Sequence, residues 1–266
     1  MGLKMNPKLL IAINIVTFIV MIILNSFAGA GAINGNSVGD IGNMYTNIIS
    51  PAGYAFSIWG LIYLELILFI GFQFYDLINN NSNYIKKTGL WFALTNIANS
   101  AWILIWVNNM IGLAAIVLLV LLFGLVQLVY KLDLEIWDAP LKEMFFVWWP
   151  IVVYFGWVLI ASVQNITIFI SSLQIGLLEN NTGIAIVLLG VVTLIYVALI
   201  RTRNLREASL VAVWAFVAIF FDQRTEFPLV AYSALIYSAI LLTVAGIHGA
   251  KNFETSPFMK LKRKEF

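Results

Sequence analysis

The sequence predicts an all-α membrane protein, a polytopic bundle of eight transmembrane helices, and three observations support this class. The chain has 266 residues, of which 62% are hydrophobic and only 11% charged, and its mean hydropathy is +0.94. A soluble domain is about one quarter charged and just under half apolar. The apolar residues gather in runs long enough to cross a bilayer, and the Lys and Arg residues lie between these runs in a regular pattern.

Breaks of Gly, Pro and polar residues separate the apolar runs and define the expected spans. The spans are residues 8–28, 51–75, 88–108, 110–130, 142–170, 182–200, 207–221 and 228–248. The fifth contains Pro150 and is too long for a perpendicular crossing, so we expect a kink or a tilt there. The seventh is the shortest of the eight.

The distribution of positive charge predicts the orientation of these spans. Of the 15 Lys and Arg residues, 14 fall on one side of the expected membrane, and only Arg224 falls on the other. The positive-inside rule then places both termini in the cytoplasm. We expect an integral protein of a prokaryotic cell membrane, whose basic tail acts as a topology determinant that can touch anionic headgroups.

Several function classes lack the residues they require. The chain has no Cys and a single His, His248, which argues against disulfides, thiolate catalysis and a dedicated transition-metal site. It also has no phosphate-binding loop and no nucleic-acid motif. We therefore expect no obligatory cofactor and no nucleic-acid partner; the expected partners are the lipid bilayer and a small hydrophobic ligand.

The second span carries an unusual face. Phe56, Trp59 and Tyr63 recur at helical spacing and share one side of the helix. The hydroxyl of Tyr63 cannot be satisfied by lipid, which argues against a face that simply points into the bilayer. Because the face carries three aromatic rings, we expect it to hold something flat and apolar. Glu65 lies near mid-span, where a carboxylate is costly and usually faces a bundle interior. It is a possible proton or cation site, or a structural neutral acid.

The third span places side-chain amides beside tryptophans. Asn96, Asn99 and Ser100 are three and four residues apart, and Trp102 and Trp106 follow them. An isolated Asn in a membrane helix commonly bonds to a neighbouring helix. Because Asn99 shares a face with both tryptophans, we also consider it as a polar anchor inside an aromatic pocket.

The fifth span presents a similar face. Four positions run down one side of it, namely Tyr154, Trp157, Ala161 and either Gln164 or Asn165. Trp157 is too deep for an interfacial residue, and the small Ala161 leaves space beside its ring. Trp148 and Trp149 lie nearer the cytoplasmic interface, where Trp commonly anchors a helix.

These patterns resemble a known family. The second span opens with Pro51 and carries Trp59-Gly-Leu-Ile-Tyr63, and the third carries Asn99-Ser-Ala-Trp102. The fifth carries Tyr154-Phe-Gly-Trp157-Val-Leu-Ile-Ala161-Ser-Val-Gln-Asn165. In this order they resemble the translocator protein family, also called TspO, tryptophan-rich sensory proteins or peripheral-type benzodiazepine receptors.

The resemblance covers about residues 8–170 and implies a division of the chain. Residues 1–172 would form a TspO-like five-helix core, and residues 173–266 three further transmembrane helices with the basic cytoplasmic tail. Ser50 and Val153 stand where the family usually has Pro, which bears on the pocket shape. The loop at 29–50 is rich in Gly, Asn and Ser and is expected to be a lid or disordered.

The family binds tetrapyrroles such as protoporphyrin and haem, along with sterols, and some members promote light-dependent porphyrin breakdown. The resemblance implies that Trp59 and Trp157 are the pocket rings and that Tyr63, Asn99 and Ala161 line the pocket. Together with the helical faces, the expected ligand-binding residues are Phe56, Trp59, Tyr63, Asn99, Trp102, Tyr154, Trp157, Ala161 and Asn165.

Three functional hypotheses follow. The leading one is a membrane receptor or binding protein for a flat hydrophobic ligand, namely a tetrapyrrole or a sterol-like molecule. Binding would have a sensory or transport consequence, and a homodimer is one expected form of the protein. The second is a proton-coupled transporter of small solutes that uses Glu65. The third is an enzyme that degrades porphyrin in light, with Trp59 and Trp157 as its catalytic residues. We favour binding over catalysis.

Overall fold

The structure, a computed structural model, describes residues 5–45, 47–174 and 181–265, and this part of the chain contains helices and no strands. The long helices are α1 (Pro7–Gly29), α3 (Ile58–Ile78), α5 (Trp91–Val107), α6 (Ile111–Lys131), α8 (Trp149–Ser172), α9 (Thr182–Arg203), α10 (Arg206–Gln223) and α11 (Pro228–Lys251). The shorter elements are α2 (Val38–Asn43), η1 (Gly53–Ser57), α4 (Asn83–Thr88), α7 (Leu141–Glu143), η2 (Met144–Trp148), η3 (Phe253–Thr255) and α12 (Pro257–Arg263).

The long helices follow the expected spans in order, which confirms the all-α membrane class. Among the described residues, six helical stretches are long and apolar enough to cross a membrane. They are Pro7–Gly29, Gly53–Ile78, Ile111–Lys131, Leu141–Ser172, Thr182–Arg203 and Pro228–Lys251. The two remaining long helices do not meet this criterion of length and composition. α5 has only 17 residues, and α10 carries the charged residues Arg206, Glu207 and Asp222. The count of eight spans therefore stays a prediction.

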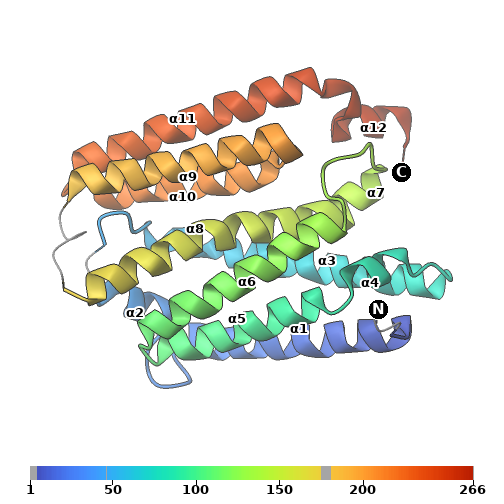
Figure 1. Ribbon diagram of the computed structural model, residues 1–266, viewed down its shortest axis with the longest axis horizontal. Coiled ribbons are helices and arrows are strands. Elements are labelled where there is room, and N and C mark those ends of the chain that lie inside the picture. The colour runs from blue at the N-terminus through green and yellow to red at the C-terminus, as the bar shows by residue number, and fades with distance from the viewer. Residues whose placement is uncertain (1–4, 46, 175–180, 266) are drawn as a thin grey trace.

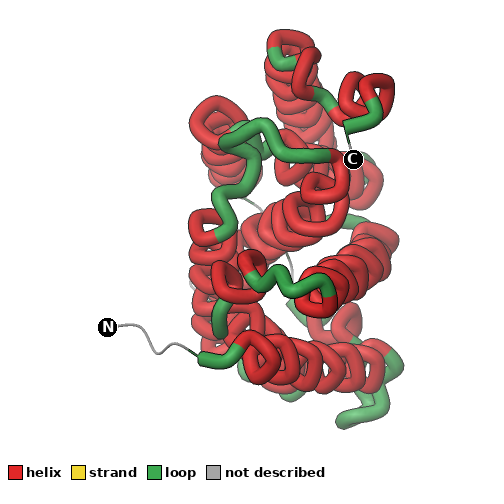
Figure 2. The backbone as a smooth tube through the Cα atoms, turned by 90° about the vertical axis from the view of Figure 1, so that its right-hand side faces the viewer, coloured by secondary structure: helices red, strands yellow, loops and turns green. Residues whose placement is uncertain are grey.

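The helices form a layered bundle. In Figure 1, α9, α10 and α11 make one layer, α3 and α8 lie in the middle, and α1, α5 and α6 make the opposite layer. The tube in Figure 2 shows the same helices closer to end-on. α8 packs against both α6 and α10, so it is the central helix and its residues are the most completely buried of the six candidate spans.

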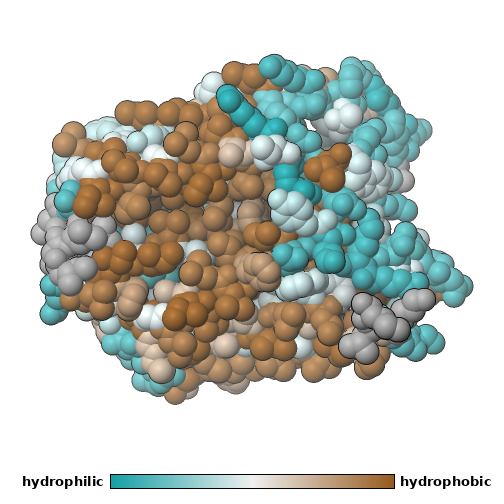
Figure 3. Space-filling view, viewed as in Figure 1, coloured by the Kyte–Doolittle hydropathy of each residue, from teal (hydrophilic) through white to brown (hydrophobic). Residues whose placement is uncertain are grey.

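The surface has the pattern of a membrane protein. A broad hydrophobic band covers most of the face seen in Figure 3, and polar residues gather at the end where α4, α7 and α12 lie. α1 begins and α12 ends at this same end of the bundle (Figure 1). This agrees with an even number of crossings, while the assignment of that end to the cytoplasm stays a prediction.

The expected irregularity near Pro150 takes the form of a π-helical segment. Met144–Trp148 is π-helical and leads directly into α8, where Pro150 occupies the first turn. Proline has no backbone N–H and its ring crowds the carbonyl four residues earlier, so a regular α-helix cannot run through this point. The long fifth stretch is thus divided just before Pro150.

The 29–50 loop is more ordered than its composition suggests. It contains α2, whose first turn is fixed by a capping box between Ser37 and Asp40. The Asp40 N–H donates to Ser37 Oγ at 3.2 Å, and the Ser37 N–H donates to Asp40 Oδ2 at 2.7 Å. The indole N–H of Trp106 donates to the carbonyl of Val38 at 3.0 Å and ties α2 to α5.

The basic tail does more than carry positive charge. Part of it forms α12, and Lys260 in that helix is buried, with only 3% of its surface exposed. Its ammonium pairs with Asp138 and lies 3.6 Å from Glu265. Lys260 is therefore not free to touch headgroups as we expected of the basic tail, because it docks α12 against the segment before α7; the role of the tail in topology stays a prediction.

The last three long helices pack closely on the first five. Gly156 of α8 lies so near Ala208 of α10 that an added Cβ would come within 2.8 Å of the Ala208 Cα. The hydroxyl of Tyr196, from α9, donates to the Gly156 carbonyl at 2.6 Å. Glycine permits this approach because it has no side chain to hold the backbones apart. Whether residues 1–172 form a separate folding unit remains a prediction.

Candidate functional site

Six aromatic rings from four elements of the bundle form one cluster, in which Trp59 contacts four of the others. This aromatic cluster consists of Phe56 from η1, Trp59 and Tyr63 from α3, Trp102 from α5, and Tyr154 and Trp157 from α8. The Trp59 ring lies 5.5 Å from Tyr63 and 6.4 Å from Trp102, in stacked arrangements. It meets the edges of Tyr154 at 5.9 Å and Trp157 at 6.3 Å. These separations lie in the range in which aromatic rings attract one another.

Amide side chains hold two of these rings in place. Asn99 is fully buried, and its amide donates to the hydroxyl of Tyr154 at 3.0 Å. Asn25, on α1, donates to the Asn99 carbonyl oxygen at 2.8 Å and continues the chain of hydrogen bonds. The indole N–H of Trp102 donates to Asn165 Oδ1 at 3.0 Å. The amides fix the rings because buried polar groups in a membrane must find partners within the protein.

One buried polar atom of the cluster has no hydrogen-bond partner among the described residues. The indole nitrogen of Trp157 is buried and makes no hydrogen bond to the described residues. Phe56 lies edge-on to Trp157 at 5.9 Å and keeps 40% of its surface exposed, and Trp59 is half-buried. The cluster therefore combines an accessible aromatic edge with a buried hydrogen-bond donor, a combination that suits a flat ligand carrying an acceptor.

The structure brings together all nine of the expected ligand-binding residues. The six rings, Asn99 and Asn165 form one connected group, and Ala161 joins it through its carbonyl, which accepts a hydrogen bond from the Asn165 amide at 3.0 Å. Of the two alternatives on α8, Asn165 reaches the cluster, whereas Gln164 bonds to Asn47 at 2.9 Å. The sequence analysis missed Asn25, although an amide inside an apolar span was a visible signal.

Glu65 lies elsewhere. Glu65 lines a separate groove of about 600 Å³ between α3, α8 and α10, whose walls are mostly apolar. We call this groove the acidic groove because two acidic residues, Glu65 and Glu207, line it. Trp149, which we expected at the membrane interface, faces this groove. Trp148, expected beside it, is buried with 3% of its surface exposed, so neither tryptophan acts simply as an interfacial anchor. Tertiary packing of α8 against its neighbours decides both positions.

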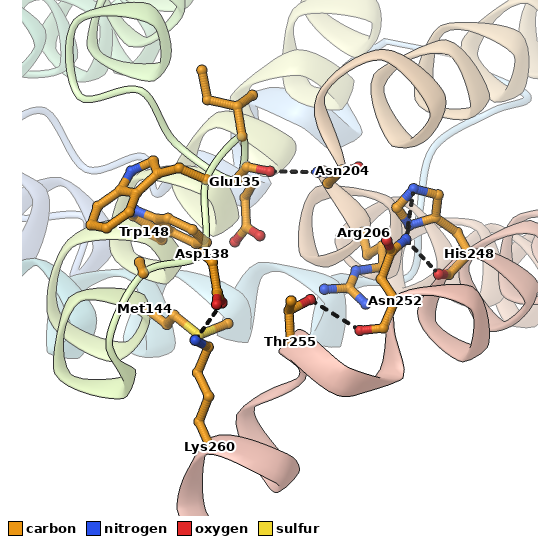
Figure 4. Close-up of a pocket in the computed structure, with 13 residues that line it drawn as sticks. Glu135, Asp138, Met144, Trp148, Asn204, Arg206, His248, Asn252, Thr255 and Lys260 are labelled. Carbon is orange, nitrogen blue, oxygen red and sulfur yellow. Dashed lines mark hydrogen bonds and ion pairs between the residues drawn. The ribbon is translucent and has the colours of Figure 1, made fainter. Parts of the chain in front are cut away.

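A third feature is a polar pocket of about 190 Å³ at the end of the bundle near α12 (Figure 4). Its lining includes Glu135, Arg206, His248 and Lys260, and Figure 4 shows Lys260 reaching Asp138 across one side. The pKa of Glu135 is raised to about 9, first by burial and second by the charge of Glu207, while the charge of Arg206 opposes the shift. The carboxyl of Glu135 is therefore neutral at pH 7.

The described residues contain no group of three or more His, Asp or Glu side chains that could hold a metal ion. The aromatic cluster itself offers rings, amides and hydroxyls, which can bind a ligand by stacking and hydrogen bonding. Three of its rings, Trp59, Trp102 and Trp157, are tryptophans of the sequence motifs described above.

Comparison with known proteins places this arrangement in a family. A family model described as TSPO-like protein matches residues 11–247, which is most of the chain. The match continues past residue 170, so it includes helices beyond the first five long helices, among which α3, α5 and α8 carry the motifs. Comparison with curated proteins and with solved structures gives no match. The matched range and the motif-bearing bundle together show that this chain belongs to the TSPO-like family.

Proposed function

We propose that this protein binds a flat, apolar ligand at the aromatic cluster and that tetrapyrroles such as protoporphyrin fit the site best. The observation that carries the proposal is the convergence of rings from α3, α5 and α8 on the half-buried Trp59. A planar ligand can replace ring–ring contacts with stacking of the same kind. Membership in the TSPO-like family supports the same ligand class.

The indole N–H of Trp157 has no partner among the described residues, which favours a ligand that carries a hydrogen-bond acceptor. A buried donor without an acceptor costs about 1–3 kcal/mol, and an acceptor on the ligand would remove that cost. Protoporphyrin combines a large planar ring with carboxylate groups that accept hydrogen bonds. A sterol has a single hydroxyl and no aromatic ring, so stacking favours the tetrapyrrole.

The proposal is tested by titrating the purified full-length protein with protoporphyrin and following the Soret absorbance. We expect saturable binding in the wild type and much weaker binding in the double variant Trp59→Phe, Trp157→Phe. Replacing both rings by the smaller Phe keeps the site apolar while it removes stacking area and the indole donor. Equal affinity in the two proteins would exclude the aromatic cluster as the binding site.

A further inference from the structure

Phe56 is the one ring of the aromatic cluster that no long helix carries. It lies in η1, the 3-10 helix of five residues before α3, and η1 has no side-chain cap at its first residue. The Phe56 ring pairs edge-on with Trp157 at 5.9 Å and with no other ring among the described residues. A 3-10 helix has poorer hydrogen-bond geometry than an α-helix. The position of Phe56 therefore depends on contacts that hold η1 from outside.

Helix α10 provides such contacts through three hydrogen bonds to the chain just before Phe56. The indole N–H of Trp214 donates to the Ala55 carbonyl at 3.0 Å. The Ala52 N–H donates to the Ala218 carbonyl at 3.1 Å, and the Gln223 amide donates to the Ser50 carbonyl at 3.4 Å. Residue numbers fall along α10 as they rise from 50 to 55, so the two segments run antiparallel. We call Trp214, Ala218 and Gln223 the α10 clamp.

The bond from Trp214 is the one nearest to the aromatic cluster. Ala55 is fully buried, and its carbonyl also accepts the N–H of Ile58, the first residue of α3. This carbonyl lies directly before Phe56 in the chain and at the junction of η1 with α3. The edge contact of the Tyr54 and Trp214 rings, at 5.2 Å, holds the indole beside it. A buried backbone carbonyl in a membrane protein needs partners within the protein, so the bond contributes to the position of η1.

We propose that Trp214 is a positioning residue for ligand binding, because the α10 clamp holds η1 so that Phe56 forms a wall of the ligand site beside Trp157. Trp214 pairs with no ring of the aromatic cluster among the described residues, so it acts through Phe56. This role rests on the proposed function, since it requires a ligand at the cluster. It gives the last three long helices a part in a site whose motifs lie on α3, α5 and α8.

A double-mutant cycle tests whether Trp214 acts through Phe56. Full-length wild type, Trp214→Phe, Phe56→Leu and the double variant are each titrated with protoporphyrin, and the Soret absorbance is followed. Trp214→Phe keeps a ring beside Tyr54 and removes the donor, so affinity should fall about two- to tenfold, the range for one hydrogen bond. In the Phe56→Leu protein the same substitution should cost nothing more. Additive losses would show a purely structural role and overturn the proposal.

Trp137→Phe is the matched control. Trp137 lies between α6 and α7, is exposed to a similar extent as Trp214, and also meets a neighbouring ring edge-on, that of Trp148 at 5.8 Å. Its substitution should leave protoporphyrin affinity unchanged, and an equal loss there would contradict a specific role for Trp214. Wild type that binds no protoporphyrin would refute the proposed function, whereas wild-type binding with unchanged affinity in Trp214→Phe would refute the clamp alone.

Hydrogen–deuterium exchange tests the clamp without any ligand. In Trp214→Phe, the amides of residues 52–58 should exchange faster than in the wild type, because η1 opens locally more often, while those of α6 should not change. Gln223→Met removes another bond of the clamp and should act in the same direction, which covers the case in which Trp214→Phe does not fold. Circular dichroism and gel filtration establish folding. Unchanged exchange at residues 52–58 in the folded variants would overturn the proposal.

Discussion

Asn99 is the residue that holds the amide network of the aromatic cluster together, since it donates to Tyr154 and accepts from Asn25. We predict that Asn99→Ala lowers stability by about 1–3 kcal/mol, because it leaves the buried hydroxyl of Tyr154 without the donor that Asn99 supplies, whereas the Asn25 amide keeps its bond to the Met21 carbonyl. A single hydrogen bond in a membrane protein averages only about 0.6 kcal/mol, so the unpaired hydroxyl is the larger effect. Thermal unfolding in detergent measures the change.

The control for this prediction is Asn79→Ala. Asn79 is exposed, and its amide bonds only to the carbonyl of Tyr75 one turn earlier. Its loss should therefore lower the melting temperature less than the loss of Asn99. If the two variants melt at the same temperature, the buried network contributes little to stability.

Glu135 gives a pH dependence at the residue scale. Its pKa rises from an ordinary 4.5 to about 9 in the folded protein, so unfolding between these values releases a proton. Stability should therefore decline as the pH rises from about 4.5 to about 9. Glu135→Gln should reduce that decline and raise the melting temperature at neutral and alkaline pH, because the amide cannot ionise.

The pH series of melting temperatures needs a matched acid that is exposed. Glu226→Gln is the matched control, because Glu226 is exposed, and it should change the dependence of the melting temperature on pH less than Glu135→Gln does. Wild-type stability that is flat between pH 5 and pH 9 would show that Glu135 ionises without penalty. The same pocket is also lined by Arg206, His248 and the pair of Lys260 with Asp138. The effect of Glu135 is therefore the difference between wild type and Glu135→Gln in how the melting temperature changes with pH.

At the scale of elements, the contact between α8 and α10 depends on Gly156. An added Cβ would lie 2.8 Å from the Cα and 2.9 Å from the carbonyl oxygen of Ala208, and backbone atoms cannot rotate away. We predict that Gly156→Ala lowers stability by about 1–3 kcal/mol through overpacking. Gly60→Ala, which meets nothing within 4 Å, should be neutral or slightly stabilising. Detergent unfolding of both variants tests this, and equal stability would contradict the close packing.

Helical periodicity explains how much of these elements could be predicted. The shared faces of Phe56, Trp59 and Tyr63 follow from spacing along one helix, and the structure places them in one cluster. The capping box of Ser37 and Asp40 was also visible as a local pattern, although the sequence analysis treated that loop as a lid or disordered. Local patterns are predictable because they need no knowledge of neighbouring helices.

The groove and the buried tail could not be predicted in the same way. Glu207 shares a groove with Glu65 only because α10 packs antiparallel to the chain that enters α3, and nothing within either segment fixes that register. Lys260 is buried because α12 folds back on the segment around Asp138. Both depend on contacts between residues far apart in the sequence.

At the scale of the whole molecule, the first prediction concerns the orientation of the bundle in the membrane. α1 begins and α12 ends at one end of the bundle (Figure 1), and the positive-inside rule assigns that end to the cytoplasm. Reporter fusions after residues 40, 83, 178 and 264 should be outside, inside, outside and inside; residue 178 lies outside the described residues. An outside position for the fusion after residue 264 would contradict both the eight-span count and the assignment.

A second whole-molecule prediction concerns the division of the chain. All motif residues lie within residues 1–172, so we expect this fragment to bind protoporphyrin. It should unfold at a lower temperature than the full chain, because Ala52 and Ala55 lose hydrogen bonds to α10. Titration and thermal unfolding of the purified fragment measure both. A folded fragment that binds no protoporphyrin would show that the site requires the last three long helices.

The most direct test of the account titrates protoporphyrin into three single variants, Trp59→Phe, Trp157→Phe and Trp149→Phe. The first two residues belong to the aromatic cluster, and Trp149 lines the acidic groove. Loss of one stacked ring is worth roughly 0.5–1.5 kcal/mol beyond burial, so affinity should fall several-fold in the first two variants and stay unchanged in the third. If Trp149→Phe weakens binding as much as the others, or if Trp59→Phe and Trp157→Phe have no effect, the ligand does not bind at the aromatic cluster.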